Sequence, residues 1–470
     1  MKKIISLMLG AAVAVSVLIA GAGCAPQKSQ AGVVTIGYYD GGYGTAWLDD
    51  VIYKYRAETG GEVVYDANSS VLATMESDLR DDNAYDIYIS HGIPMERYAA
   101  SGYLKNLDDL YTEEVSEGVT FEDRVIDSAL EVSKYEGHYY KVPYTQGVGG
   151  IVYNKTMFEE NKWPVPDTYE GLVALCETIR DAKIEVEDSY VAPFVWSGNG
   201  EEYMWDYLVN EWWAQMVGVD KIEKTVQYES MEVFDPNGNY KEFKQAYSLW
   251  YDLIAAEKGN SVSGVEGLTK TTSQAAFKNG LAAMIPNAHW IYNEMSSLDL
   301  GFEMGFMPTP AAPGTTGETK YNYLVGFGDS IVVSANTPNY EEVKSFLKFL
   351  ARPESCASFT EKTNGTFLAF DYSSVTIDSS AVTPQAMTFI QSVKDKLETS
   401  VSFSTYSSAK ISYMTNELMT FPGNQYFYTA AYTNSSSLIN GNITPDSVFD
   451  YLYSYVQNNW NRWTIMAGLR

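Results

Sequence analysis

The chain has few of the side chains that metal sites, disulfide frameworks and nucleophilic triads require. Its 470 residues include only 3 cysteines and 3 histidines. Cys176 and Cys356 are the cysteines that follow Cys24, too few for a disulfide framework in a chain of this length. We expect each to be a small buried apolar residue, and the sequence leaves a single bridge between them open. Because no metal-ligand spacing is present, we predict no metal site.

Positive charge is also scarce. The sequence has 32 Lys and Arg against 60 Asp and Glu, a formal net charge of −28. Nucleic-acid phosphates would be repelled by this excess of acid, so we predict no nucleic-acid partner. The same excess disfavours a polybasic contact with anionic lipid headgroups. We attribute the acidity to solubility.

The common catalytic and nucleotide-binding motifs are missing. There is no G-x-x-x-x-G-K-[ST] loop, no G-x-G-x-x-G, no G-x-S-x-G elbow and no H-E-x-x-H. We therefore predict no cofactor, and any ATPase motor must be a separate chain. The abundant acids leave one catalytic class open, a glycosidase that uses two carboxylates, because one sequence cannot pair any two of them.

One long uncharged apolar run is present, at residues 4–23, between two lysines and Cys24. A charged start, an apolar stretch and small residues before a cleavage point are typical of a secretory signal. The run ends in LIAGAGC, which resembles a bacterial lipobox, although Gly21 stands where lipoboxes usually carry leucine. The resemblance implies that Cys24 becomes the lipidated first residue of the mature protein. The alternatives are a plain secretory signal and, less in keeping with the polar residues that follow, a transmembrane helix.

These features predict a signal peptide over 1–23 and a flexible tether over 24–32, which is short and polar. The remainder would lie outside the cytoplasm, held by lipid on the outer face of the cytoplasmic membrane. No second apolar run approaches membrane-spanning length.

Aromatic residues are plentiful, with 37 Tyr, 19 Phe and 10 Trp. Tyr and Trp combine a flat apolar face with a hydrogen-bonding tip. Sugars have both apolar faces and polar rims, so this composition favours a sugar ligand, although many of these side chains will be core.

The first part of the mature chain alternates strand and helix patterns. The strand patterns are at 33–36, 63–65 and 86–89, and the helical patterns are at 47–55 and 70–81. This order predicts right-handed crossovers and a parallel sheet. Ligands on such sheets bind beyond the carboxyl ends of the strands.

The loops at 38–45 and 90–94 are therefore candidate ligand loops. Tyr39, Asp40 and Tyr43 lie in the first, where acidic side chains would accept hydrogen bonds from sugar hydroxyls, and His91 begins the second. Further along, the sequence predicts a strand at 331–333, a helix over 343–350, and a helix that begins at Thr444-Pro445.

Four stretches in order resemble the extracellular solute-binding protein family 1, the sugar-receptor family that includes maltose-binding protein. The most specific begins with Lys141-Val142-Pro143-Tyr144 and continues through Gly150-Ile-Val-Tyr-Asn-Lys155 to Pro166-Asp-Thr168. The others are Tyr98–Asp109, Ala276–Trp290 and Lys344–Glu354. Together they span nearly the whole mature chain.

The resemblance implies an α/β fold of the two-lobe, periplasmic-binding-protein-like kind (type II), with the ligand in a cleft between hinge-linked lobes. It places the crossings between lobes near Tyr144, Pro308 and Asn364. Lobe one would then be 33–145 plus 309–363, and lobe two 146–308 plus 364–470.

The resemblance also implies ligand contacts. Trp290 stands where the family places its pocket tryptophan, with Asn287 and His289 beside it as hydrogen-bonding candidates. Trp196 follows a predicted strand, at its carboxyl end. The remaining candidates lie near the hinge, before the 331–333 strand, or in a late helix: Gln146, Phe327, Asp329 and Tyr428.

Other tryptophans are expected in the core rather than in a pocket, because they fall in amphipathic stretches: Trp205, Trp212, Trp213, Trp460 and Trp463.

By resemblance, the chain is a non-catalytic, lipid-anchored carbohydrate receptor that feeds an ATP-driven importer. Its partners would be a carbohydrate and the permease subunits of an ABC transporter, and we expect a monomer that meets the membrane through its lipid alone. The alternatives are a surface glycosidase or lyase that acts on polysaccharide, and a sugar sensor or adhesin with the same fold.

Overall fold

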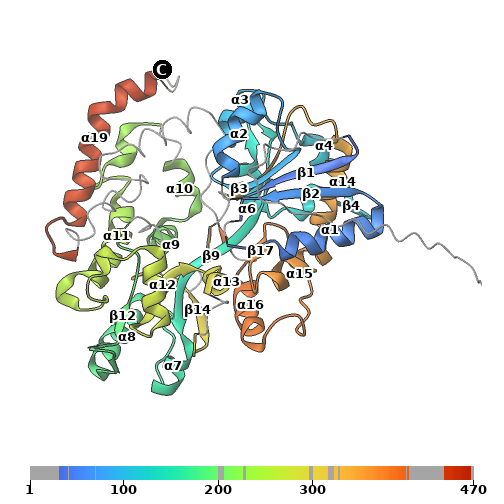
Figure 1. The fold of residues 1–470 in the computed structure, drawn as a ribbon. Coiled ribbons are helices and arrows are strands. Elements are labelled where there is room, and N and C mark those ends of the chain that lie inside the picture. The colour runs from blue at the N-terminus through green and yellow to red at the C-terminus, as the bar shows by residue number, and fades with distance from the viewer. Residues whose placement is uncertain are drawn as a thin grey trace, which may run out of the picture.

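The computed structural model describes residues 31–40, 42–68, 70–199, 206–225, 229–295, 300–315, 322–325, 329–397, 400–401 and 439–466. Two mixed sheets with helices packed around them form the molecule (Figure 1). We call the five-stranded sheet with its helices the first lobe, and the seven-stranded sheet with its helices the second lobe.

The first lobe begins with the predicted alternation of strands and helices. Its strands, in spatial order, are β2 (Glu62–Ala67), β1 (Val33–Tyr38), β3 (Ile87–His91), β16 (Asp329–Val333) and β8 (Val142–Pro143). β1 runs parallel to both β2 and β3, as predicted. β16 and β8 are antiparallel to their neighbours, so the sheet as a whole is mixed rather than parallel.

Helices of the first lobe follow the sequence pattern closely. α1 (Ala46–Thr59) is capped at its C-terminal end by Gly60, which adopts a left-handed conformation with φ of 72° and donates its N–H to the Arg56 carbonyl. Glycine takes this conformation without a Cβ penalty, so the predicted helix end is confirmed. The helices are α1 (Ala46–Thr59), α2 (Val71–Arg80), α3 (Met95–Ala100), α4 (Asp108–Thr112), α5 (Phe121–Arg124), α6 (Asp127–Leu130), α14 (Tyr340–Leu350) and α15 (Pro353–Lys362).

The second lobe is built around one long central strand, β9 (Thr145–Asn154). Antiparallel partners lie on both sides of it. The other strands are β12 (Ala192–Phe194), β13 (Ala282–Ala288), β14 (Met304–Pro308), β15 (Asn322–Val325), β17 (Phe367–Leu368) and β18 (Ser400–Val401). Nine of the ten residues of β9 are buried, as expected for a strand at the centre of a sheet.

Helices cover the second lobe and carry much of the aromatic core. They are α7 (Lys155–Asn161), α8 (Tyr169–Ala182), α9 (Asp206–Val217), α10 (Val219–Thr225), α11 (Lys241–Ile254), α12 (Lys270–Lys278), α13 (Ile291–Met295), α16 (Pro384–Leu397) and α19 (Pro445–Met466). The four tryptophans predicted as core that the structure describes are all buried: Trp212, Trp213, Trp460 and Trp463. Trp205 lies outside the described residues.

Three two-stranded hairpins complete the strands of the described residues: β4 (Glu114–Ser116) with β5 (Val119–Thr120), β6 (Lys134–Tyr135) with β7 (His138–Tyr139), and β10 (Glu185–Val186) with β11 (Ser189–Tyr190).

The chain passes between the lobes at points that differ in part from the prediction. It leaves the first sheet at Pro143 and enters the second at Thr145. The second crossing does not fall near Pro308, because β15 still pairs with Gly147 and Val148 of β9, and the chain returns to the first sheet only at β16. A boundary at residue 309 is therefore too early.

The third passage lies next to a strained turn. Asn364 and Gly365 both have positive φ, 49° and 114°, and β17 follows and pairs with β9. Past this strand the chain still contacts the first lobe, since Arg124 donates to the Asp371 carbonyl and the Tyr372 hydroxyl donates to the Cys356 carbonyl. First-lobe contacts thus extend beyond residue 363.

Cys176 and Cys356 are both free and buried, which confirms the expected role as small apolar residues and excludes a bridge between them in this structure. Burial raises the pKa of each thiol to about 12. No described helix has both the length and the hydropathy that crossing a bilayer requires.

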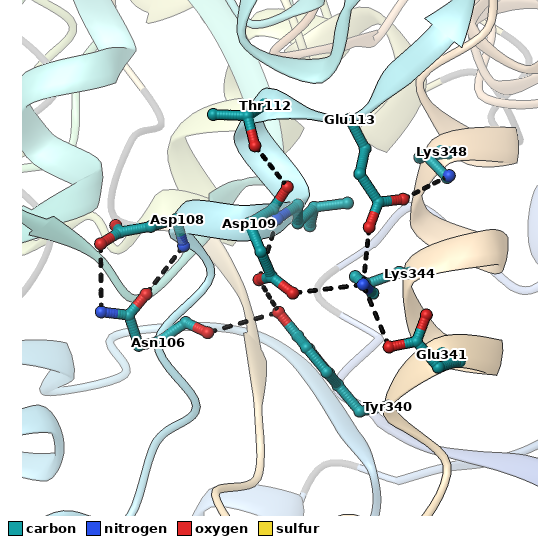
Figure 2. A network of polar contacts seen from close by, with 10 residues as sticks. Asn106, Asp108, Asp109, Thr112, Glu113, Tyr340, Glu341, Lys344 and Lys348 are labelled. Carbon is teal, nitrogen blue, oxygen red and sulfur yellow. Dashed lines mark hydrogen bonds and ion pairs between the residues drawn. The ribbon is translucent and has the colours of Figure 1, made fainter.

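A buried lysine joins two helices of the first lobe (Figure 2). The Lys344 side chain on α14 is 7% exposed, and its Nζ lies 2.6 Å from a Glu113 carboxylate oxygen and 3.2 Å from one of Asp109. Tyr340 donates its hydroxyl to the same Asp109. The carboxylates hold the pKa of Lys344 above its usual value against the opposing effect of burial.

We expect Lys344→Met to lower the free energy of unfolding by about 2 kcal/mol, the usual worth of hydrogen bonds to charged groups. Urea unfolding measures the change. Lys54→Met is the matched control, because Lys54 pairs with Asp50 on the surface of α1 with 47% of its side chain exposed. Such pairs contribute at most about 1 kcal/mol. Equal losses in the two variants would contradict a special role for Lys344.

Candidate functional site

The two predicted ligand loops of the first lobe lie side by side. β1 and β3 are adjacent and parallel, with Tyr38 opposite Ile89, so their carboxyl ends meet at one edge of the sheet. Tyr39 and His91 follow there, with ring centroids 4.4 Å apart at an interplanar angle of 80°. Tyr39 is half-buried and His91 exposed, so both present surface at this edge.

Asp40 shapes the first of these loops. Its Oδ1 accepts hydrogen bonds from the backbone N–H groups of Gly42, at 3.1 Å, and Gly44, at 2.9 Å. Both glycines have positive φ, 114° and 69°, a conformation that few other residues tolerate. The exposed carboxylate of Asp40 therefore stabilises the turn, independently of any contact with a ligand.

Tyr43 connects this loop to the central strand of the second lobe. Its half-buried ring packs edge-on against Tyr144 and Phe359, with centroids 5.8 and 6.0 Å away. Its hydroxyl lies 3.5 Å from the Thr145 hydroxyl at the start of β9.

Trp290 is a half-buried aromatic residue of the second lobe. It stands between β13 and α13, and its six-membered ring packs on the backbone of Gly147 in β9. A Cβ at Gly147 would come within 2.8 Å of the indole, closer than carbon atoms approach. Glycine at this position is therefore required for the present place of Trp290.

Tyr207, on α9, is a neighbour of Trp290 that the sequence analysis missed. Its ring stands at 86° to the indole, with centroids 6.1 Å apart. A Cβ on Gly149 would lie 2.6 Å from the Tyr207 Cβ, and one on Gly150 would lie 2.6 Å from the Met307 carbonyl.

Gly147, Gly149 and Gly150 thus form a glycine floor, over which neighbouring chain and side chains pass at short distance. Glycine normally weakens a strand, and a run of it within a central strand is typical of close approach by another group. This run was the available sequence signal for Tyr207.

His289 lies beneath Trp290 and is fully buried. Its backbone N–H donates to the Val148 carbonyl, and its Nδ1 accepts from the Val148 N–H at 3.2 Å. Burial lowers the pKa of His289 to about 3, against a weaker opposing effect of the Gly365 backbone. The ring is therefore neutral at pH 7, with its proton on Nε2.

Two other candidates are buried at the same strands. Asn287 is 0% exposed, and its Oδ1 accepts from the Ala288 N–H. Gln146 is 2% exposed, and its amide nitrogen donates to the carbonyls of Leu368 and Phe370. In this arrangement, His289, Asn287 and Gln146 support the strands around Trp290 and do not reach its exposed side.

Trp196 lies in the core of the second lobe and not beside Trp290. It is 1% exposed, its indole N–H donates to the Ser261 hydroxyl at 3.1 Å, and its ring packs edge-on against Trp250. Because both faces are covered, no sugar ring can stack on it here. The position after a strand, β12, is as predicted, but the side chain turns inward.

Three candidates are not placed as side chains. Asp329 begins β16, and its backbone pairs with His91. Phe327 and Tyr428 lie outside the described residues.

Within the described part of the chain, no three His, Cys, Asp or Glu side chains gather as a metal site. The accessible candidates are instead aromatic and polar: Tyr39, Asp40, Tyr43 and His91 from the first lobe and Trp290 from the second. A partly exposed apolar ring together with accessible hydrogen-bonding side chains suits an uncharged polar ligand better than an anion or a metal.

Comparison with known proteins agrees with this picture. The model of the bacterial extracellular solute-binding protein family matches residues 38–355, more than half of the chain. The protein belongs to this family, whose members bind solutes rather than catalyse reactions.

Curated relatives match over part of their length. The multiple sugar-binding protein of Streptococcus mutans is 30% identical over 212 residues, 45% of this chain and 47% of the relative. The diacetylchitobiose binding protein NgcE of Streptomyces coelicolor is 20% identical over 340 residues, 69% of this chain and 66% of the relative. The matched regions thus span about half to two thirds of these relatives.

A solved structure shows the same fold over nearly the whole chain. The apo form of RafE from Streptococcus pneumoniae superposes with a TM-score of 0.66 at 16% identity, and covers 91% of this chain and 98% of its own. At this identity, the likeness establishes the α/β fold with two mixed sheets.

Proposed function

We propose that the protein is a lipid-anchored receptor that captures an oligosaccharide outside the cytoplasm and delivers it to an ABC importer. The observation that carries the proposal is Trp290, half-buried on the glycine floor, in a segment that is hydrogen-bonded through Asn293 to the Gly42 loop of the first lobe.

Sugar chemistry fits this arrangement. The axial C–H face of a pyranose is apolar, and burying it against an indole removes both surfaces from water. The hydroxyl rim needs hydrogen-bond partners, because uncompensated desolvation is costly. In this proposal, the accessible Tyr39, Tyr43 and His91 of the first lobe would serve as such partners.

The relatives support a carbohydrate ligand. The two curated relatives are named for the binding of multiple sugars and of diacetylchitobiose. RafE, which shares the fold, has also been solved in complex with raffinose. Membership of the solute-binding family supports permease subunits as partners, reached when the lobes close on the ligand.

A thermal-shift panel of mono- and oligosaccharides tests the ligand class. A sugar at 100 times its Kd should stabilise the protein by roughly 2.7 kcal/mol. Nucleotides and amino acids serve as controls and should leave the melting temperature unchanged. If no sugar of the panel raises the melting temperature, the proposal is contradicted. New reducing ends in the incubated oligosaccharides would indicate a glycosidase instead.

The anchor is tested separately, through Cys24. We expect Cys24→Ser to block lipid attachment, because the thiol is the only nucleophile at that position that a diacylglycerol could modify. The variant should move from the detergent phase to the aqueous phase or the medium. Ala25→Ser, which keeps the thiol, should stay with the detergent. Unchanged partitioning of Cys24→Ser would rule out the lipid.

A further inference from the structure

One side chain of the second lobe, Asn293, donates a hydrogen bond to a loop of the first lobe. The Asn293 Nδ2, on α13, donates a hydrogen bond of 2.7 Å to the backbone carbonyl of Gly42. Gly42 belongs to the turn that follows β1, and α13 follows β13. The bond therefore joins a loop of the first sheet to a helix of the second.

The acceptor of this bond is fixed by Asp40. The carboxylate Oδ1 holds the N–H groups of Gly42 and Gly44 from the inside of the turn. With its N–H turned toward Asp40, Gly42 presents its carbonyl to Asn293. Loss of the Asp40 acceptor would free a turn whose two glycines have few conformational restraints of their own.

The donor is fixed by its own helix, which also begins beside Trp290. The Glu294 N–H donates to the Trp290 carbonyl, so Asn293 and Trp290 belong to one helical turn. Tyr292 stacks on Phe389 of α16, with centroids 4.7 Å apart, and Glu294 accepts from Gln274 of α12. Neither Trp290 nor Asn293 can move far from the second lobe independently.

We infer that Asp40, Gly42 and Asn293 form a latch that holds the two lobes in the ligand-binding arrangement. Asp40 is then a positioning residue that acts through the turn and does not touch the sugar. The inference rests on the proposed function, since the latch acts on the same site. Because apparent affinity scales with the fraction of molecules in the binding-competent arrangement, the latch raises affinity without a contact to the ligand.

Removal of the donor is the first test. Asn293→Ala should raise the Kd for the best sugar of the panel roughly fivefold, the usual worth of one hydrogen bond. Asn293→Asp should do the same, because a carboxylate cannot donate to a carbonyl. Asn279→Ala, at an exposed position after α12 in the same lobe, is the control and should bind like the parent protein.

Variants of Asp40 distinguish a positioning role from direct contact with the sugar. Asp40→Asn keeps the Oδ1 acceptor, so it should bind within about twofold of the parent, whereas Asp40→Ala should match Asn293→Ala. The double variant Asp40→Ala with Asn293→Ala should be no weaker than either single variant, because both break one contact. An Asp40→Asn variant as weak as Asp40→Ala would mean that the carboxylate meets the sugar, and would overturn the positioning role.

The distance between the two lobes, measured in the absence of sugar, does not depend on any contact with the ligand. Tyr53 on α1 is 73% exposed and Tyr190 on β11 is 54% exposed, so cysteines introduced there accept a fluorophore pair. The native Cys176 and Cys356 are buried, and Cys24→Ser removes the remaining thiol. Energy transfer should fall in Asn293→Ala relative to Asn279→Ala.

Unchanged energy transfer together with unchanged Kd would overturn the latch. Different results would contradict the proposed function: a thermal-shift panel in which no sugar binds, or a Trp290→Ala variant that binds the sugar with full affinity. In either case the distance measurement without sugar still decides on the latch.

Discussion

Trp290→Ala should weaken binding of the cognate sugar by roughly thirtyfold or more and leave the protein folded. Loss of a central aromatic anchor often costs about 2 kcal/mol or more, against a total of about −8 kcal/mol for micromolar binding. Trp290 is half-buried and packs in a small cluster with Tyr207 and Ala288, apart from the main core. Its removal should therefore reduce stability only modestly.

Calorimetry with the best sugar of the panel measures this effect. Trp290→Phe is the matched control, because a smaller ring on the glycine floor retains an apolar face and should recover part of the affinity. Full affinity in Trp290→Ala with an intact melting transition would place Trp290 at the periphery of the site and remove the main support for a sugar pocket here.

The elements that the sequence predicted well are those whose signals are local. The helix over 47–55 has apolar residues at helical spacing and ends at Gly60-Gly61, and both features reflect contacts within a few residues. The strands at 33–36, 63–65 and 86–89 fall at their expected places. Their order also singled out the loops with Tyr39 and His91 as candidate ligand loops.

Pairings between distant segments were not visible in the sequence. β15 has only four residues, and its place beside β9 depends on the geometry of the second sheet, not on its own pattern. The antiparallel direction of β16 and β8 likewise follows from how the chain returns to the first lobe. The crossing predicted near Pro308 was displaced for this reason.

At the candidate site, aromatic residues were the hardest to assign. Trp290 was selected through its motif, whereas nothing in its local spacing separates it from Trp212, which is core. Tyr207 lies on a helix whose aromatic residues also fill the core, so helical spacing alone favours burial for all of them. Tyr207 differs from the other aromatic residues of this helix in packing against Gly149 of β9, a contact between segments distant in the sequence.

Trp196→Ala should lower the free energy of unfolding by about 3–5 kcal/mol, the range for aromatic-to-alanine changes in a core. The side chain is 1% exposed, packs edge-on against Trp250 and donates to Ser261, so its removal leaves both a cavity and an unpaired hydroxyl. Sugar affinity should stay within about twofold of the parent wherever the variant is folded.

Urea unfolding of Trp196→Ala and Trp290→Ala under one set of conditions separates the two tryptophans. The expected results are opposite: a large loss of stability with little loss of affinity for Trp196, and a large loss of affinity with little loss of stability for Trp290. Trp196→Phe should recover much of the stability, because it keeps an aromatic ring in the same cavity. If Trp196→Ala instead lost affinity at unchanged stability, Trp196 would face the ligand when the lobes bind it, and the sequence-based prediction of a pocket residue would be right.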